Sequence, residues 1–286
     1  YGKAMQAISG IHFNYSLPEE LWISHIFQDE DMDQISLRNS IYFRTVRNLV
    51  RLNWLVLYLY GCSPLINDVF RNQSYKFKKL NNNDYFLPYA TSLRMSDMGY
   101  KNSIQDNLFI SLNDLENYIK DLKKATQVKS DDFEKIYNKT DESRPQLNSN
   151  RIQIEDEYYA VARPKNSSNL DIRMLEKLNT GGIDYIELRS IDLNPFSNIG
   201  IDEEMAYFLE ILMIYATFSS SQPMSENEYR ISNQNDLNVS IRGREPNLLL
   251  SRNGGRVSLQ EWGLEVIKSM ETLLDSIDVE GNKYLY

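Results

Sequence analysis

The sequence is poor in the side chains that most often form cross-links or bind metals. Among 286 residues it has one cysteine, Cys62, and two histidines. A single cysteine cannot form an internal disulfide, so the fold does not depend on an oxidising compartment. We expect Cys62 to be a small buried residue after a helix, because a reactive thiolate needs an accessible and positively charged setting.

The sequence also lacks a long apolar run and an excess of positive charge. The longest suspicious apolar stretch, residues 54–60, is far shorter than the ~20 residues that a membrane-spanning helix needs, and no signal peptide is visible. There are 31 basic and 40 acidic residues, a net charge of −9. Because duplex-binding domains are usually basic, we expect neither nucleic acid nor a membrane as partner, and a cytoplasmic location.

The composition is otherwise that of a globular protein. The hydrophobic fraction is 42% and the charged fraction 25%, values that exclude a largely disordered chain. Strand and helix patterns do not alternate strictly, which disfavours a doubly wound parallel sheet. The sequence therefore predicts an α+β fold with a mainly antiparallel sheet.

Periodicity and capping residues place the main elements. Strands with one polar face are predicted at residues 8–16, 151–163 and 183–193. Helices are predicted at residues 36–60, 113–124, 202–218 and 258–277, with Asn113 and Asp202 as caps and a Ser-x-x-Glu capping box opening the last. Residues 126–149 are predicted as a surface excursion, and residues 219–257 as irregular chain with short strands.

Two predicted strands carry polar side chains that could form a binding surface. Glu187 and Arg189 lie two positions apart and so point to the same face of their strand. A carboxylate suits Mg²⁺ and a guanidinium is matched to phosphate, although the same two residues could form a surface ion pair. His12 and Asn14 share the polar face of the first strand, where a lone histidine is more often a structural hydrogen-bonding residue.

Three further patterns have two interpretations each. A helical stripe of arginines is either a solvated face or an acid-binding one, and the polar segment 91–100 is either a turn or a ligand clamp. The second strand would add a polar face to the sheet. The residues concerned are Arg44, Arg47 and Arg51 of the stripe, and Gln153, Glu155, Glu157 and Tyr159 of the strand.

Several blocks of the sequence resemble the bacterial glutamate–cysteine ligases. The longest are MQAISGIHFNYSLP at 5–18, YATSLRMSDMGY at 89–100 and YIELRSIDLNPFS at 185–197, with shorter matches at 42–48, 61–64, 147–159 and 163–165. The blocks follow the family order and span nearly the whole chain. The resemblance implies a glutamine-synthetase-like fold, with the active site on an antiparallel sheet flanked by helices.

The resemblance also implies an activity. Enzymes of this family use ATP to join the γ-carboxyl of L-glutamate to L-cysteine through a γ-glutamyl phosphate. The products are γ-glutamylcysteine and ADP, in the first step of glutathione biosynthesis. Mg²⁺ or Mn²⁺ would be the metal cofactor, ATP the cosubstrate, and L-glutamate and L-cysteine the other small-molecule partners.

Roles for four residues of the sheet follow from the same resemblance. His12 and Glu187 match the metal-site residues of the family. Arg189 would hold the transferred phosphate, so Glu187 and Arg189 are the predicted catalytic residues. Asn14 and Arg189 are the residues predicted to bind the nucleotide.

Roles for four further residues concern the amino-acid substrates. Gln6 and Arg94 would grip glutamate, Arg94 through its guanidinium fork. Tyr100 and Tyr159 would line the cysteine pocket.

The family also carries acidic metal-binding residues in a segment before the position of Tyr1. We therefore expect residues 1–286 to be a single catalytic core that is truncated at both ends and inactive by itself. Two alternatives remain. One is another ATP-dependent carboxylate–amine ligase of the same fold, and the other is a non-catalytic fragment.

Overall fold

The computed structural model describes residues 8–18, 32–99, 105, 108–137 and 147–277. Its central feature is a three-stranded antiparallel sheet in the order β1 (Ile11–Tyr15), β6 (Tyr185–Ile191) and β5 (Ala162–Lys165). In this register Glu187 of the middle strand is opposite Asn14 on one side and Arg163 on the other. These three residues therefore belong to one face of the sheet.

The other face of the sheet is buried by a long central helix. Ile186, Leu188 and Ser190 of β6 are buried, whereas Tyr185, Glu187 and Arg189 are half-buried. The covering helix is α2 (Gln34–Tyr60), whose first turn is capped by the Asp33 carboxylate and which ends at Gly61. Because α2 covers the apolar face of the sheet, the opposite, polar face is the one that could bind ligands.

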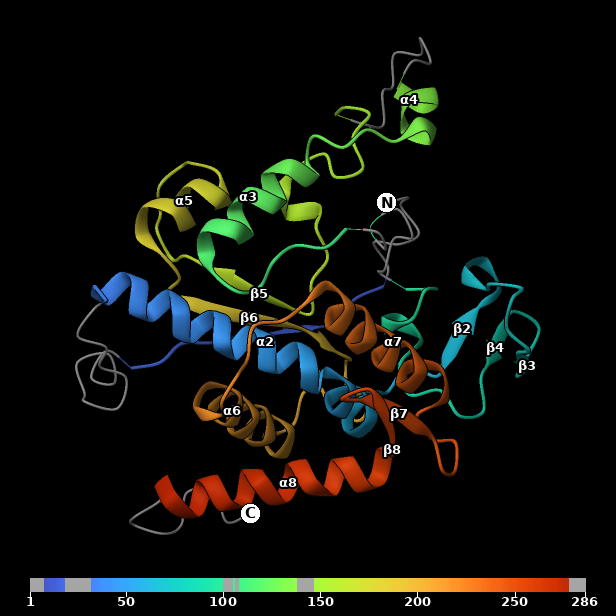
Figure 1. Cartoon of the computed structure of the whole chain (residues 1–286). Helices are drawn as coiled ribbons and strands as arrows, with labels where there is room; N and C mark the ends of the chain where they lie inside the picture. The colour runs from blue at the N-terminus through green and yellow to red at the C-terminus, as the bar shows by residue number, and fades with distance from the viewer. Residues whose placement is uncertain (1–7, 19–31, 100–104, 106–107, 138–146, 278–286) are drawn as a thin grey trace.

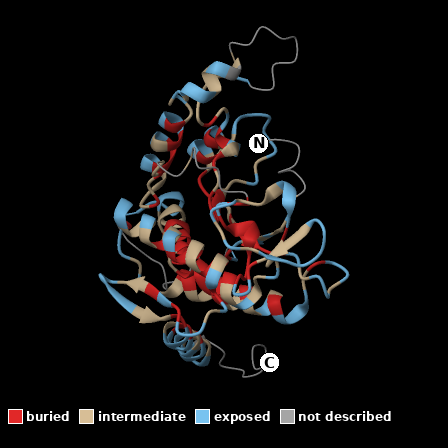
Figure 2. Cartoon of the chain, turned by 90° about the vertical axis from the view of Figure 1, so that its right-hand side faces the viewer, coloured by how far each residue is buried: buried red, intermediate tan, exposed pale blue. Residues whose placement is uncertain are grey.

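The remaining helices pack mainly around α2 (Figure 1). The largest contacts with α2 are made by α6 (Glu203–Phe218) and α7 (Glu226–Arg242), and α8 (Leu259–Ile277) packs on α6. α3 (Leu115–Ala125) and α5 (Met174–Gly181) pack against each other, and α4 (Asp131–Tyr137) lies outside them. Figure 2 shows the buried residues gathered along this helical centre.

Smaller elements complete the structure. A second antiparallel sheet has the order β2 (Leu65–Asn67), β4 (Asp84–Phe86) and β3 (Lys78–Lys79), and β7 (Leu249–Arg252) pairs with β8 (Gly255–Ser258). Short 3-10 helices occur at Asp68–Phe70, Leu93–Met95 and Glu155–Glu157. Among the described residues, no helix is long and apolar enough to cross a membrane.

Most of the predicted elements are confirmed, together with the α+β class and the antiparallel sheet. The strands predicted at 8–16 and 183–193 correspond to β1 and β6, and the helices predicted at 36–60, 202–218 and 258–277 to α2, α6 and α8. Asp202 caps α6 as predicted, accepting from the Met205 amide at 2.8 Å. The cap of α3 is Asp114 rather than Asn113.

The strand predicted at 151–163 is wrong over most of its length. The chain turns at Glu155–Glu157, where the Tyr158 amide donates to the Glu155 carbonyl at 3.2 Å, and only Ala162–Lys165 pairs in the sheet. Burial of Ile152 and Tyr158 in the core drives this turn. The predicted strand face, with residues 153, 155, 157 and 159 in a row, therefore does not exist.

Helix α7 was not predicted, because its sequence lacks an apolar stripe. Its inward side buries Ser232, Asn235 and Asp236, and Asn53 of α2 donates to the Asp236 carboxylate at 2.7 Å. Ser225 caps the helix by accepting from the Glu228 amide at 3.2 Å. The spacing of Ser225 and Glu228 is that of a capping box, and it was the signal that could have revealed the helix.

The arginine stripe of α2 is not a solvated face. Arg47 is buried and donates to the carbonyls of Leu112 at 2.9 Å and Asn113 at 3.2 Å. Burial, reinforced by the nearby Arg51 charge, lowers the pKa of Arg47 to about 10. Arg47 therefore connects α2 to a distant segment, and Arg51 does the same through Ser221 and Glu228. Cys62 also differs from its prediction, since it is exposed.

Replacing Arg47 by Met is expected to destabilise the fold by about 2 kcal/mol, because buried carbonyls would lose their donors. Denaturant unfolding of the complete protein would measure the free energy of unfolding. Arg230→Met is the matched control. Arg230 is an exposed partner of Glu226 on α7, and its loss should change stability by less than ~0.5 kcal/mol. Equal effects of the two substitutions would contradict the structural role of Arg47.

Candidate active site

Glu187 lies at the centre of the polar face of the main sheet, among three basic side chains. Its carboxylate oxygens are 3.1 Å from His12 Nδ1, 3.7 Å from Lys165 Nζ and 3.9 Å from Arg189 Nε. The Glu187 side chain is only 14% exposed. Lys165 and Arg189 together carry more positive charge than one carboxylate can balance, so the surface favours an anionic ligand such as phosphate.

Arg189 carries donors that the described residues do not satisfy. Its Nε and Nη1 atoms are buried and have no hydrogen-bond acceptor in the described part of the chain. The distance from Nε to the Glu187 carboxylate is too long for a hydrogen bond. Burying a donor without an acceptor destabilises the folded protein. A phosphate oxygen is an acceptor that matches a guanidinium well.

Tyr159 lies beside Arg189, with the guanidinium carbon 5.8 Å from the centroid of its ring. The Tyr159 hydroxyl donates to Met95 Sδ at 3.2 Å, and its backbone amide donates to the Gln105 side chain at 2.9 Å. Burial raises the pKa of Tyr159 to about 12, against the opposing charges of Arg94 and Arg189. The side chain is therefore a neutral phenol that is fixed next to the basic cluster.

His12 and Asn14 lie on the same face as Glu187, as their strand positions predicted. Desolvation lowers the pKa of His12 against the attraction of Glu187, and the charge of Arg189 lowers it further. His12 is therefore neutral at pH 7, which is the form that binds metals. Asn14 lines an open pocket of about 340 Å³ with residues that include Ser167 and Asp184.

A complete metal site is not present within the described residues. No group of three or more His, Cys, Asp or Glu side chains in this part of the chain could hold a metal ion. His12 and Glu187 are adjacent and chemically suited to a divalent cation, but they supply only part of a coordination shell. They fit two positions of a metal site whose other ligands would lie elsewhere.

The structure describes six of the eight predicted site residues. The last of these six is Arg94, on the 3-10 helix Leu93–Met95. The positive charge of Arg94 opposes the rise in the pKa of Tyr159. Arg94 Nε donates to the Asp192 carboxylate at 2.7 Å. Gln6 and Tyr100 lie outside the described residues. Sequence reasoning missed two residues of the site. Lys165 lies two positions beyond the predicted strand 151–163, and Asp192 is the last residue but one of the predicted strand 183–193.

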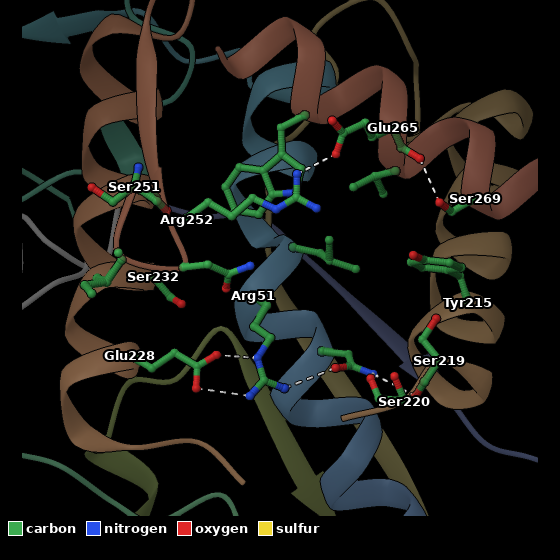
Figure 3. Close-up of a pocket in the computed structure, with 18 of the residues that line it drawn as sticks. Arg51, Tyr215, Ser219, Ser220, Glu228, Ser232, Ser251, Arg252, Glu265 and Ser269 are labelled. Atoms are coloured by element: carbon green, nitrogen blue, oxygen red, sulfur yellow. Dashed lines mark hydrogen bonds and ion pairs between the residues drawn. The ribbon is translucent and has the colours of Figure 1, made fainter. Parts of the chain in front are cut away.

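A second pocket, of about 480 Å³, lies between α2, α7, α8 and the β7–β8 hairpin (Figure 3). None of the predicted site residues lines it. Its arginines are already paired, Arg51 with Glu228 at 2.6 Å and Arg252 with Glu265 at 2.5 Å. Because these charges cancel, the pocket does not offer the unsatisfied donors of the sheet, which remains the candidate active site.

A model of the glutamate–cysteine ligase family matches residues 1–239. The chain belongs to the glutamate–cysteine ligase family. Among curated members, the glutamate–cysteine ligase of Janthinobacterium sp. is 38% identical over 282 residues, covering 98% of this chain and 53% of that protein. The Vibrio campbellii glutamate–cysteine ligase is 40% identical over 292 residues, covering 99% and 56%. The chain thus spans about half the length of these relatives.

Solved structures agree with this assignment. The crystal structure of the Francisella tularensis glutamate–cysteine ligase in complex with AMP matches with a TM-score of 0.88 and 32% identity, over 96% of this chain and 55% of that one. A bifunctional glutathione synthetase from Pasteurella multocida matches with a TM-score of 0.68 and 23% identity, over 97% of this chain and 30% of that one. The second likeness supports the fold alone.

Proposed function

We propose that this chain is the catalytic core of an ATP-dependent ligase that joins the γ-carboxyl of L-glutamate to the amine of L-cysteine. The observation that carries the proposal is the pair of unsatisfied Arg189 donors beside Glu187, on the polar sheet of a chain of this family. The AMP complex of the Francisella relative supports ATP as the cosubstrate. In this proposal residues 1–286 form one catalytic core, and the enzyme acts in the cytoplasm.

The reaction would proceed in two steps. An oxygen of the glutamate γ-carboxylate attacks the γ-phosphorus of ATP, and ADP leaves. The cysteine nitrogen then attacks the carbonyl carbon of the γ-glutamyl phosphate, forming the amide and releasing inorganic phosphate and a proton. Arg189 would donate to the transferred phosphoryl group in both steps, since charge on its oxygens must be stabilised throughout.

The other residues would hold the reactants. A divalent cation, Mg²⁺ or Mn²⁺, would neutralise phosphate charge when bound, with His12 and Glu187 as two of its ligands. Asn14 would contact the nucleotide. Arg94, together with Gln6, would bind a carboxylate of glutamate.

Tyr159 is proposed to shape the cysteine pocket, together with Tyr100. Tyr159→Ala is expected to raise KM for cysteine about tenfold while changing KM for ATP by less than about twofold, because one aromatic wall of a small pocket is lost. Steady-state kinetics with each substrate varied in turn would show this. Tyr159→Phe keeps the ring and is the control. Equal rises in all three KM values would indicate a structural tyrosine.

The proposed function is tested by ADP release from the complete protein. ADP should form only when glutamate, cysteine, ATP and Mg²⁺ are all present. Replacing cysteine by alanine, by glycine or by ammonium tests the acceptor, and efficient ADP release with one of these would favour another carboxylate–amine ligase. Absence of glutamate-dependent ADP release under all these conditions would contradict the proposal.

A further inference from the structure

Asp192, the residue that follows β6, accepts hydrogen bonds from four donors. Its side chain is 3% exposed. One carboxylate oxygen accepts from the Cys62 amide at 2.9 Å and the Ser63 hydroxyl at 2.7 Å. The other oxygen accepts from the Ser92 hydroxyl at 2.9 Å and Arg94 Nε at 2.7 Å. Because both oxygens are held by residues of two separate segments, the carboxylate has one fixed position.

Arg94 is held by this carboxylate through only one edge of its guanidinium. The Arg94 side chain is 6% exposed, and its Nη2 atom is buried without an acceptor among the described residues. A buried guanidinium needs a neutralising partner, which Asp192 supplies at Nε. The edge that Asp192 leaves free is suited to a second carboxylate.

Gly10 supports the guanidinium of Arg94 from a second direction. A Cβ at this position would lie 2.6 Å from Arg94 Cζ and 2.6 Å from the Ile191 carbonyl oxygen. Any side chain there would displace either the guanidinium or the backbone of the central strand. The guanidinium therefore packs directly against the chain at Gly10.

We propose that Asp192 is a positioning residue, which fixes the Arg94 guanidinium so that its free edge binds a carboxylate of the amino-acid substrate. Gly10 contributes the second support. The inference rests on the proposed function, in which Arg94 binds glutamate. Asp192 itself does not touch the substrate and acts through Arg94.

A double-mutant cycle in the complete protein tests this role. Asp192→Asn keeps the size of the side chain but removes its charge, and is expected to raise KM for glutamate about tenfold, with kcat and KM for ATP changed less than about twofold. In an Arg94→Lys background the same substitution should add less than about twofold. The proposal would be overturned if the effects of the two substitutions on KM for glutamate multiply, or if KM rises equally for all substrates.

Control variants separate positioning from folding. Asp132 is an exposed partner of Lys135 on α4, at 3.2 Å, and Asp132→Asn should leave KM for glutamate unchanged. If Asp192→Asn does not fold, Gly10→Ala tests the same guanidinium without touching the carboxylate. It should raise KM for glutamate selectively, and an unchanged KM would overturn the proposal.

Glutamate binding by calorimetry distinguishes failure of this inference from failure of the proposed function. A wild-type protein that binds glutamate without ligating it would contradict the proposed function. The cycle would then be measured on the dissociation constant for glutamate, with the same expected non-additivity. A wild-type protein that does not bind glutamate would overturn both proposals.

Discussion

Replacing Glu187 by Gln is expected to lower kcat of the complete enzyme by about 100-fold, or about 2.7 kcal/mol of transition-state stabilisation. The substitution keeps the shape of the side chain but removes the negative charge that lies within 3.9 Å of His12, Lys165 and Arg189. Both the proposed metal ligand and the partner that orients these basic groups would be lost. Steady-state ADP release at saturating substrates, measured across a Mg²⁺ titration, would show the effect.

Glu176→Gln is the matched control for Glu187. Glu176 is an exposed residue in the first turn of α5, so its substitution should leave kcat unchanged. The melting temperature of E187Q is expected to stay close to that of the wild-type protein, because the residue lies on the polar face. Wild-type turnover and metal dependence in E187Q would show that Glu187 is only an ion-pair partner.

Replacing Arg189 by Lys is also expected to lower kcat by about 100-fold. Lysine retains the positive charge, but a single ammonium group cannot present donors at the two positions occupied by Nε and Nη1. Those two atoms are buried and have no acceptor within the described chain. The expected loss of kcat therefore comes from the changed positions of the donors and not from a change in charge. It should appear in single-turnover phosphoryl transfer as well as in kcat.

Arg173→Lys is the control for Arg189. Arg173 is 73% exposed and lies 3.6 Å from Glu155, so its replacement should not affect turnover. Retention of wild-type kcat in R189K would contradict the assignment of Arg189 to the transferred phosphate. A single hydrogen-bond donor at position 189 would then be sufficient for the bound ligand.

The sequence predicted elements best where one local pattern matched the final environment. β6 alternates between buried Ile186 and Leu188 and half-buried Glu187 and Arg189, so its two faces could be assigned from spacing alone. α6 was placed correctly because Asp202 caps it and an apolar stripe follows. In both cases, burial and local propensity favour the same structure.

The sequence was misleading where tertiary contacts overrode the local pattern. α7 buries serine, asparagine and aspartate against α2, so its hydrogen bonds replace the apolar period that identifies a helix. The segment before β5 alternates in sequence but turns in space, because Ile152 and Tyr158 are both required in the core.

The candidate site could be predicted only in part for the same reason. Neighbours on one strand, such as Glu187 and Arg189, share a face by parity. The bond from Arg94 to Asp192 joins positions 98 residues apart, and that from Cys62 to Asp192 joins positions 130 apart. No local period records such a contact, so Asp192 became visible only in the folded chain.

Isotope transfer tests the central claim most directly. The complete protein would be supplied with ATP, cysteine and L-glutamate labelled with ¹⁸O in the γ-carboxylate, and the products analysed by mass spectrometry. Activation as γ-glutamyl phosphate predicts one ¹⁸O atom in each inorganic phosphate released, with γ-glutamylcysteine formed in equal amount. Formation of γ-glutamylcysteine with unlabelled phosphate, or ¹⁸O appearing in AMP, would contradict phosphoryl transfer to the glutamate side chain.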